Sequence, residues 1–239
     1  MGTTRPDDHI ATEHFSIWLR RMRKALRSGE AVDVPCGDCR GCCTSSYFIH
    51  IDADEAATLA AVPDALKFAA PGRPAGSVVL GYDRRGHCPL FDGAGCSIYE
   101  RRPRTCRTYD CRVFVATGLW VGAERPAIDR GAARFRFDLS HARDRADLAA
   151  VRAAARFLVE HAAALPAGFV PENPTQQAVV ALKVYEVFRE PAWDDETREL
   201  AVESAPAPVG NPAALASATV AALERFEAGE SPGRVESTA

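Results

Sequence analysis

The sequence lacks any long apolar run. Its first eight residues contain no apolar stretch, so no secretory signal is visible, and Pro6 stands where a myristoylation signal requires Ser or Thr. The longest uncharged run, residues 204–223, is broken by prolines and a glycine and is too polar to span a bilayer. We therefore expect a cytoplasmic protein with no membrane partner.

Cysteine is missing from most of the chain. All eight cysteines lie between Cys36 and Cys111 of a 239-residue sequence. A chain of this size buries about 70% of its unfolded surface, which excludes the small proteins that depend on disulfides for a core. Cytoplasmic thiols are kept reduced, and clustered cysteines there more often bind metal or carry out redox chemistry. The cysteine distribution therefore favours a metal site over structural disulfides.

Several catalytic motifs are also absent. The sequence contains no nucleotide-binding loop, no G-x-S-x-G and no H-E-x-x-H, so hydrolytic and nucleotide-dependent reactions have no support. The net charge of −3 disfavours nucleic acid as a partner. Residues 83–112 nevertheless contain seven Arg against four Asp and Glu. Arginines beside a thiolate site would offset its negative charge, although a solvated Arg face is the alternative.

The hydrophobic periodicity is mainly helical. Residues 10–27 predict an amphipathic helix that stops at Gly29, and helical spacing returns after Ser140. The pairs Asn173-Pro174 and Asn211-Pro212 each predict a helix start.

Shorter elements are predicted around the cysteines. Residues 47–51 and 78–80 are strand candidates, Asp52 and Glu55 resemble a capping box, and Pro103 predicts a helix that runs through Phe114. Arg134–Phe137 alternates like a short exposed strand.

We therefore expect a mainly α fold with short strands, in which an irregular cysteine-rich metal-binding lobe packs on a helical C-terminal half. The expected segments are an N-terminal amphipathic helix (1–33), a cysteine-cluster domain (34–115), a helical C-terminal region (116–228) and a disordered tail (229–239).

The cysteines form two groups. The first has the pattern C-x2-C-x2-C-C, and two cysteines separated by two residues can direct both sulfurs to one metal. The second group is dispersed. The candidate ligands are Cys36, Cys39, Cys42 and Cys43 in the first group and Cys88, Cys96, Cys106 and Cys111 in the second.

These residues resemble a known family. The C-x2-C-x2-C-C run, the detached Cys88 and the segment G-C-S-I-Y-E-x-R-P-x-x-C-R from Gly95 to Arg107 resemble the YkgJ-type cysteine-cluster family, which is described as a zinc- or iron-chelating domain. The resemblance covers roughly residues 34–112. It implies that seven of the cysteines are metal ligands and leaves Cys111 as the weakest candidate. A related cluster occurs in the flagellin lysine N-methylase, so the resemblance also implies that some relatives are enzymes.

Other side chains near the cysteines are candidates for supporting roles. Arg102 and Arg107 could contact a cofactor or an anionic substrate, or could form surface ion pairs instead. Tyr99 is expected to pack rather than to act as an acid. His50 and His87 flank the two groups and could each supply a ligand, although a lone histidine is more often structural.

The spacing does not decide which metal is bound. Zinc ribbons have a second C-x2-C pair, which is missing here, whereas the first three cysteines match the C-x2-C-x2-C triple of bacterial ferredoxins. We therefore favour an iron–sulfur cluster over zinc. Two functions remain open: a metal-binding module with closed thiolate ligands, and an iron–sulfur enzyme that performs redox or group-transfer chemistry. The sequence identifies neither a protein partner nor a catalytic residue.

Overall fold

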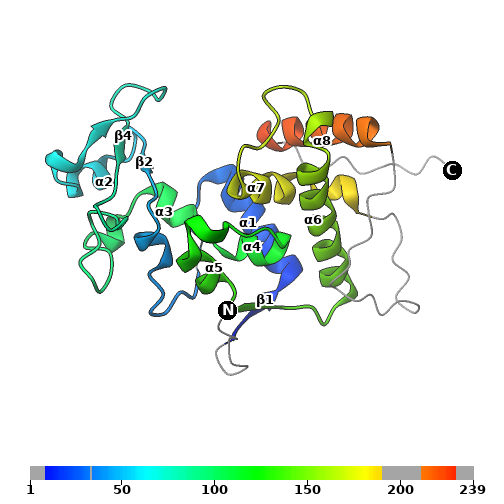
Figure 1. The fold of residues 1–239 in the computed structure, drawn as a ribbon, viewed down its shortest axis with the longest axis horizontal. Coiled ribbons are helices and arrows are strands. Elements are labelled where there is room, and N and C mark those ends of the chain that lie inside the picture. Colours follow the sequence, from blue (N-terminus) through cyan, green and yellow to red (C-terminus); the bar gives the residue numbers. More distant parts are fainter. Residues whose placement is uncertain (1–8, 33, 190–210, 230–239) are drawn as a thin grey trace. The chain divides into compact units, whose positions relative to one another are not determined.

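The structure is a computed structural model that describes residues 9–32, 34–189 and 211–229 (Figure 1). The chain divides into two compact units, and each is built from separate stretches of sequence. Unit 1 comprises Met1–His9, Lys24–Arg112 and Val121–Phe135, and unit 2 comprises Ile10–Arg23, Val113–Trp120 and Arg136–Ala239. The prediction of a mainly helical chain with few short strands and a cysteine-rich lobe is confirmed. The expected tail beyond Gly229 lies outside the described residues.

Unit 2 contains most of the long helices. These are α6 (Ala142–Glu160), α7 (Pro174–Val184) and α8 (Pro212–Glu227), with short 3-10 turns at Ala162–Ala164 and Tyr185–Phe188. Alanine, leucine and phenylalanine side chains of α6, α7 and α8 form one buried cluster. The Asn173 side chain accepts a hydrogen bond from the Gln176 amide, and Asn211 accepts one from Ala213, so both predicted Asn-Pro helix starts are confirmed.

The N-terminal part of the described chain differs from the prediction. Residues 10–14 form a strand, β1 (Ile10–His14), that pairs with β5 (Phe135–Asp138), and the helix α1 begins only at Phe15 and ends at Ser28. Phe15 and Trp18 pack their rings against Phe137. The predicted strand near residue 135 is thus present, but it is not exposed along its whole length, because Phe135 is buried.

Unit 1 contains a three-stranded antiparallel sheet in the order β2 (Ile49–Ile51), β4 (Val78–Leu80), β3 (Phe68–Ala69). Both strand predictions in this region are confirmed. The remaining elements are α2 (Ala56–Ala61), α3 (Arg104–Thr108), α5 (Pro126–Ala132) and 3-10 turns at Gly41–Thr44, Asp64–Leu66, Tyr99–Arg101 and Gly122–Glu124. Ile49, Ile51 and Leu80 lie in a buried cluster that Cys88, Cys96 and Cys106 pack against.

Two helix boundaries differ from the prediction. The helix from Pro103 stops at Thr108, and a second helix, α4 (Arg112–Thr117), follows. The break arises because the Asp110 carboxylate accepts the Arg112 amide at 2.9 Å and so provides a new helix start. The helix after Asp52 begins at Ala56, although Glu55 does reach back to accept the Asp52 amide at 3.1 Å.

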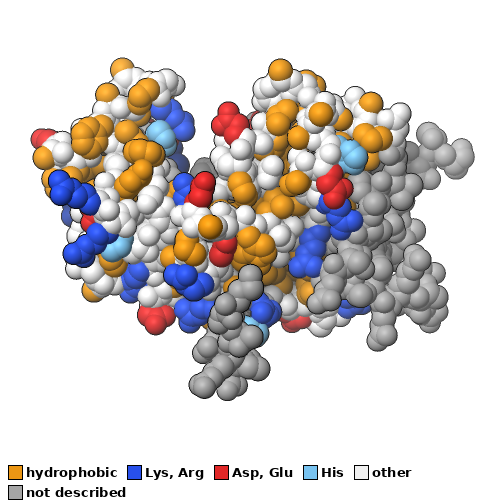
Figure 2. Space-filling model, in the orientation of Figure 1, with side chains coloured by type: hydrophobic (Ala, Val, Ile, Leu, Met, Phe, Trp, Pro, Cys, Tyr) orange, Lys and Arg blue, Asp and Glu red, His pale blue; other side chains and the backbone are white. Residues whose placement is uncertain are grey.

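The surface of unit 1 exposes some aromatic side chains. Phe48 is 62% exposed, and its ring lies 5.2 Å from that of the exposed Tyr82. Figure 2 shows hydrophobic side chains among basic and polar ones on this part of the molecule. Of the helices in the described part of the chain, none combines the length and the apolar character needed to cross a bilayer.

Candidate metal centre

The first cysteine group lies on a tight loop. The Cys39 amide donates to the Cys36 carbonyl at 2.9 Å, and the Cys43 amide donates to the Arg40 carbonyl at 3.0 Å. Gly37 has a φ of +56°, a conformation that other residues rarely adopt. Two successive turns therefore fold the short segment that carries the first four thiols.

Helix α5 packs closely against this loop. A Cβ atom on Gly41 would lie 2.8 Å from the Ala127 carbonyl oxygen, and a Cβ atom on Gly131 would lie 2.8 Å from the Cys39 sulfur. Both distances are shorter than carbon contacts allow. The two glycines are therefore required for the close approach of α5 to the first cysteine group.

Arg40 connects the two cysteine groups through backbone carbonyls. Its Nε donates to the Ala94 carbonyl at 2.6 Å, two residues before Cys96, and its guanidinium also donates to the carbonyls of Gly37 and Cys39 at 2.8 and 3.0 Å. The Asp92 carboxylate accepts the Ala94 and Gly95 amides and holds the same turn. Arg40 thus places a permanent positive charge beside the thiols while it fixes the loop.

A backbone hydrogen bond joins the two groups directly. The Cys88 amide donates to the Cys43 carbonyl at 2.8 Å. Cys88 follows a turn in which the Asp83 carboxylate accepts the Arg85 and His87 amides, both at 2.8 Å. Cysteines that are 45 positions apart in the sequence are therefore neighbours in the fold.

Glu55 fixes the helix that carries Cys106. Its side chain is 2% exposed, and its Oε2 accepts the Arg104 amide at the start of α3 at 2.6 Å. The Arg107 guanidinium lies 3.6 Å from the same oxygen. Because Oε1 accepts the Asp52 amide, one buried carboxylate links the β2–α2 turn to α3.

Burial and neighbouring thiols both shift the pKa of six of these cysteines, and the neighbours that act on each one indicate which sulfurs lie close together. Charge on Cys39 or Cys42 raises the pKa of Cys36, and charge on Cys36, Cys39 or Cys42 raises that of Cys111. In the same way, Cys42, Cys88 and Cys106 all raise the pKa of Cys43, and Cys42 and Cys96 both raise that of Cys88 and of Cys106. Cys111 therefore lies near the first cysteine group and Cys43 near the dispersed cysteines, while Cys42 lies near members of both groups.

Burial keeps most of these thiols protonated. Loss of hydration raises the pKa of Cys36 to about 11 and that of Cys106 to about 12, and it also raises the pKa of Cys88 and Cys111. Cys42 is the exception, because a hydrogen bond from the Cys43 thiol lowers its pKa to about 7. A bound cation compensates the buried charge of thiolates, so binding at this site is coupled to proton release.

The donor set fits zinc or an iron–sulfur cluster, since all eight cysteines are free thiols. In the part of the chain that the structure describes, however, no three of the sulfurs all lie within 4.8 Å of one another. Sulfur atoms around tetrahedral zinc are separated by about 3.8 Å, given Zn–S bonds of about 2.3 Å. Metal binding at these thiols therefore requires the sulfurs to move closer together.

The predicted supporting side chains lie around the thiols in different ways. Arg102 stacks over the Tyr99 ring at 4.0 Å, and its charge partly offsets the effect of burial on the pKa of Cys106. Tyr99 is 57% exposed rather than packed inside. Arg107 pairs with the buried Glu55 carboxylate rather than with a surface acid.

The two histidine candidates differ in position. His87 directly precedes Cys88 and packs its ring edge-on against Phe91 at 5.6 Å. His50 lies in β2 between Ile49 and Ile51, whose side chains face the cluster that contains the cysteines. Since side chains alternate along a strand, His50 points to the opposite face of the sheet.

Comparison with known families agrees with this geometry. Residues 35–123 match the family model CxxCxxCC, described as "Putative zinc- or iron-chelating domain". The match covers 89 of the 239 residues, and we refer to this segment below as the CxxCxxCC domain. It contains all eight cysteines and ends before α5, so the helix that covers the loop lies outside the match. The comparisons with curated proteins and with solved structures gave no match.

A second set of potential metal ligands lies outside the CxxCxxCC domain and was not predicted from the sequence. His14, His141 and Asp144, in unit 2, have ligand atoms that all lie within 4.8 Å of one another. Position 14 is more than 120 residues from the other two, and the three residues form no recognisable spacing motif.

Proposed function

We propose that the CxxCxxCC domain binds metal through two four-thiolate sites that meet at the Cys42–Cys43 peptide. The first thiol set consists of Cys36, Cys39, Cys42 and Cys111, and the second thiol set consists of Cys43, Cys88, Cys96 and Cys106. The observation that carries this proposal is the hydrogen bond from the Cys88 amide to the Cys43 carbonyl, together with the packing of Cys88, Cys96 and Cys106 against one buried cluster. The effect of Cys36 and Cys39 on the pKa of Cys111 supports the placement of Cys111 in the first thiol set.

An iron–sulfur cluster at each set is the form that the donor pattern favours. In two-cluster ferredoxins, a C-x2-C-x2-C triple binds one cluster while the next cysteine of the run ligates the other. The first thiol set supplies such a triple and a remote fourth ligand, and the adjacent Cys43 belongs to the second thiol set. Zinc is the alternative, because four thiolates also complete a structural zinc site.

The cation distribution supports a negatively charged metal centre. The positive charge of Arg40 lowers the pKa of Cys42, and that of Arg102 lowers the pKa of Cys106. Arg112, close to Cys36, also favours its thiolate. The proposed setting is the reducing cytoplasm, where free thiols persist.

The enzyme alternative needs a metal position that protein sulfur does not fill. Two sets of four thiolates leave no such position, and the carboxylate of Glu55 already engages Arg107, one of the two anion-binding candidates. We therefore propose a metal-binding module rather than an iron–sulfur enzyme.

A pair of adjacent substitutions tests the division into two sets. The protein is purified without oxygen, and its visible spectrum, iron, sulfide and zinc contents are measured. We expect Cys42→Ser to lose the metal of the first thiol set and Cys43→Ser to lose that of the second, with Cys111→Ser matching the former and Cys106→Ser the latter. A colourless protein with stoichiometric zinc would indicate that the sites bind zinc and not an iron–sulfur cluster. Loss of all metal in every variant, or in none, would refute the division.

A further inference from the structure

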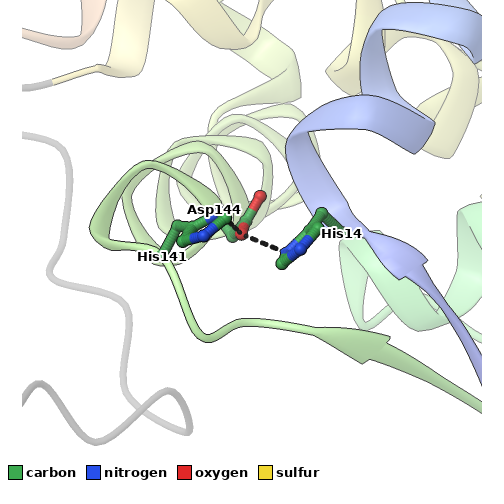
Figure 3. Close-up of side chains that lie close together, drawn as sticks. All are labelled: His14, His141 and Asp144. Carbon is green, nitrogen blue, oxygen red and sulfur yellow. Dashed lines mark hydrogen bonds and ion pairs between the residues drawn. The ribbon is translucent and has the colours of Figure 1, made fainter.

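Two histidines and two aspartates converge at one end of unit 2, away from the thiols in the sequence. His14 is the last residue of β1 and Asp138 the last of β5, and their side chains lie 3.5 Å apart at the ends of these two paired strands. His141 immediately precedes α6, and Asp144 lies in its first turn. Figure 3 shows His14, His141 and Asp144 directed toward one another.

The distances among these side chains are those of a ligand set. The Nδ1 atom of His14 lies 3.1 Å from Asp144 Oδ2, and the Nδ1 atom of His141 lies 3.5 Å from the same oxygen. Tetrahedral zinc with bonds of about 2.0–2.1 Å separates its ligand atoms by about 3.3 Å. Each nitrogen therefore lies near the oxygen at the spacing that one ion requires, with a hydrogen bond between His14 and Asp144 in place of the ion, and the ligand atoms of the three residues all lie within 4.8 Å of one another.

The carboxylate at the centre is held in place by the fold. Asp144 is fully buried, and its Oδ1 accepts the Ser16 amide at 2.8 Å near the start of α1. That hydrogen bond leaves Oδ2 directed at the histidines. The Arg145 guanidinium donates to the carbonyls of Leu139 and Ser140, both at 2.9 Å, and so fixes the segment that carries His141.

The Asp138 carboxylate lies next to His14. Asp138 Oδ2 lies 3.5 Å from the Nδ1 atom of His14, and its other oxygen accepts the Ser140 amide at 2.9 Å. With neutral imidazoles, the two carboxylates give the cluster a charge of −2, which a dication neutralises.

The histidine rings leave room for adjustment. They stack with centroids 4.3 Å apart and planes inclined by 14°. Their Nδ1 lone pairs must converge, so at least one ring has to tilt when an ion binds. His141 can do so, because its side chain is 67% exposed. Each imidazole then keeps its proton on Nε2 and presents Nδ1 to the ion.

We propose that His14, His141 and Asp144, assisted by Asp138, form a second site for a divalent transition metal of the zinc or iron(II) class. Its nitrogen and oxygen donors differ from the thiolates of the CxxCxxCC domain, so the two regions differ in metal preference. The site does not depend on the proposed thiolate centre, because it shares no residue with it.

Zinc titration of the untagged, full-length protein tests this site. The protein is purified without oxygen, so that the thiols keep their metal, and zinc binding beyond that content is measured by calorimetry. We expect one additional equivalent bound at micromolar free zinc. His141→Ala should weaken it more than about 100-fold, because loss of even a residue that only supports a ligand costs about 10–100-fold.

The controls separate this site from other histidines. His161→Ala changes a histidine beyond the other end of α6 that packs against Phe157, and it should leave the additional equivalent intact. Zinc should raise the melting temperature of the native protein and of His161→Ala but not of His141→Ala. Long-range nitrogen NMR should show Nδ1 ligation at both His14 and His141. Absence of the additional equivalent, binding only at millimolar zinc, or its persistence in His141→Ala would overturn the proposal.

Discussion

Removal of the Glu55 carboxylate should destabilise unit 1 far more than removal of any neighbouring acid. Glu55 is almost fully buried and accepts two backbone amides, those of Asp52 at 3.1 Å and Arg104 at 2.6 Å. Hydrogen bonds to charged groups contribute about 1.5–3 kcal/mol each, and a buried donor without a partner costs about 1–3 kcal/mol. Glu55→Ala should therefore lower the free energy of unfolding by about 3–5 kcal/mol.

Asp54→Ala is the matched control for this measurement. Its carboxylate pairs with Arg104 at 2.8 Å but is 66% exposed, and exposed ion pairs contribute little to stability. The two substitutions thus remove carboxylates that contact the same residue from neighbouring positions, one buried and one in solvent. The difference between the two variants in free energy of unfolding therefore isolates the effect of burying the carboxylate.

Urea denaturation followed by circular dichroism provides the assay, with the protein studied in its metal-loaded form. Glu55→Gln should fall between the other two variants, because the amide still accepts one hydrogen bond but carries no charge. Since Glu55 anchors the helix of Cys106, we also expect Glu55→Ala to lose metal from the second thiol set first. Equal stability of Glu55→Ala and Asp54→Ala would refute this reasoning.

Three further predictions concern single positions. Gly131→Ala places a Cβ atom 2.8 Å from the Cys39 sulfur and should weaken metal binding about tenfold, measured by competition with a chelator, although alanine favours the helix. In the reduced, metal-free protein, Cys42 should be alkylated first, because its pKa of about 7 gives about half thiolate at pH 7, whereas Cys106 stays protonated. Mass spectrometry should show the alkylation rate of Cys42 falling about tenfold per pH unit below 7. Equal alkylation rates at Cys42 and Cys106 would contradict the assignment. Asn173→Ala removes the side-chain cap of α7 and should cost about 1 kcal/mol in thermal unfolding, whereas an unchanged melting temperature would contradict this role.

Local signals in the sequence were sufficient to predict several helices and strands. The helix starts at Asn173 and Asn211 depend on a capping side chain and a following proline, both of which act within one turn. The strands of the small sheet in unit 1 were also visible as short apolar runs. These predictions succeeded because the decisive interactions are close in the sequence.

Elements that depend on distant partners were not predictable in the same way. Residues 10–14 follow a helical pattern but pair with β5, more than 120 positions later. The arrest of the helix at Thr108 depends on the Asp110 carboxylate, which forms a buried ion pair with Arg112 at 2.7 Å. Tertiary contacts override local propensity in both places.

The candidate site was likewise predictable only where the decisive residues are close in the sequence. The spacing of the first four cysteines predicted a metal centre, and the family match agrees with it. Which thiols lie together could not be read from spacing, because Cys111 reaches the first loop only through the path of the folded chain. The histidine cluster of unit 2 left no trace in the sequence for the same reason.

The adjacency of Cys42 and Cys43 has a consequence for biosynthesis. In the proposed division, the first thiol set spans residues 36 to 111 and the second spans 43 to 106, so one is nested within the other along the chain. Neither set is complete until the segment that carries Cys106 and Cys111 has left the ribosome. Truncated chains that end before this segment would hold up to six thiols but no complete site. In this division, metal would be inserted late, and both sites would become able to bind metal almost together.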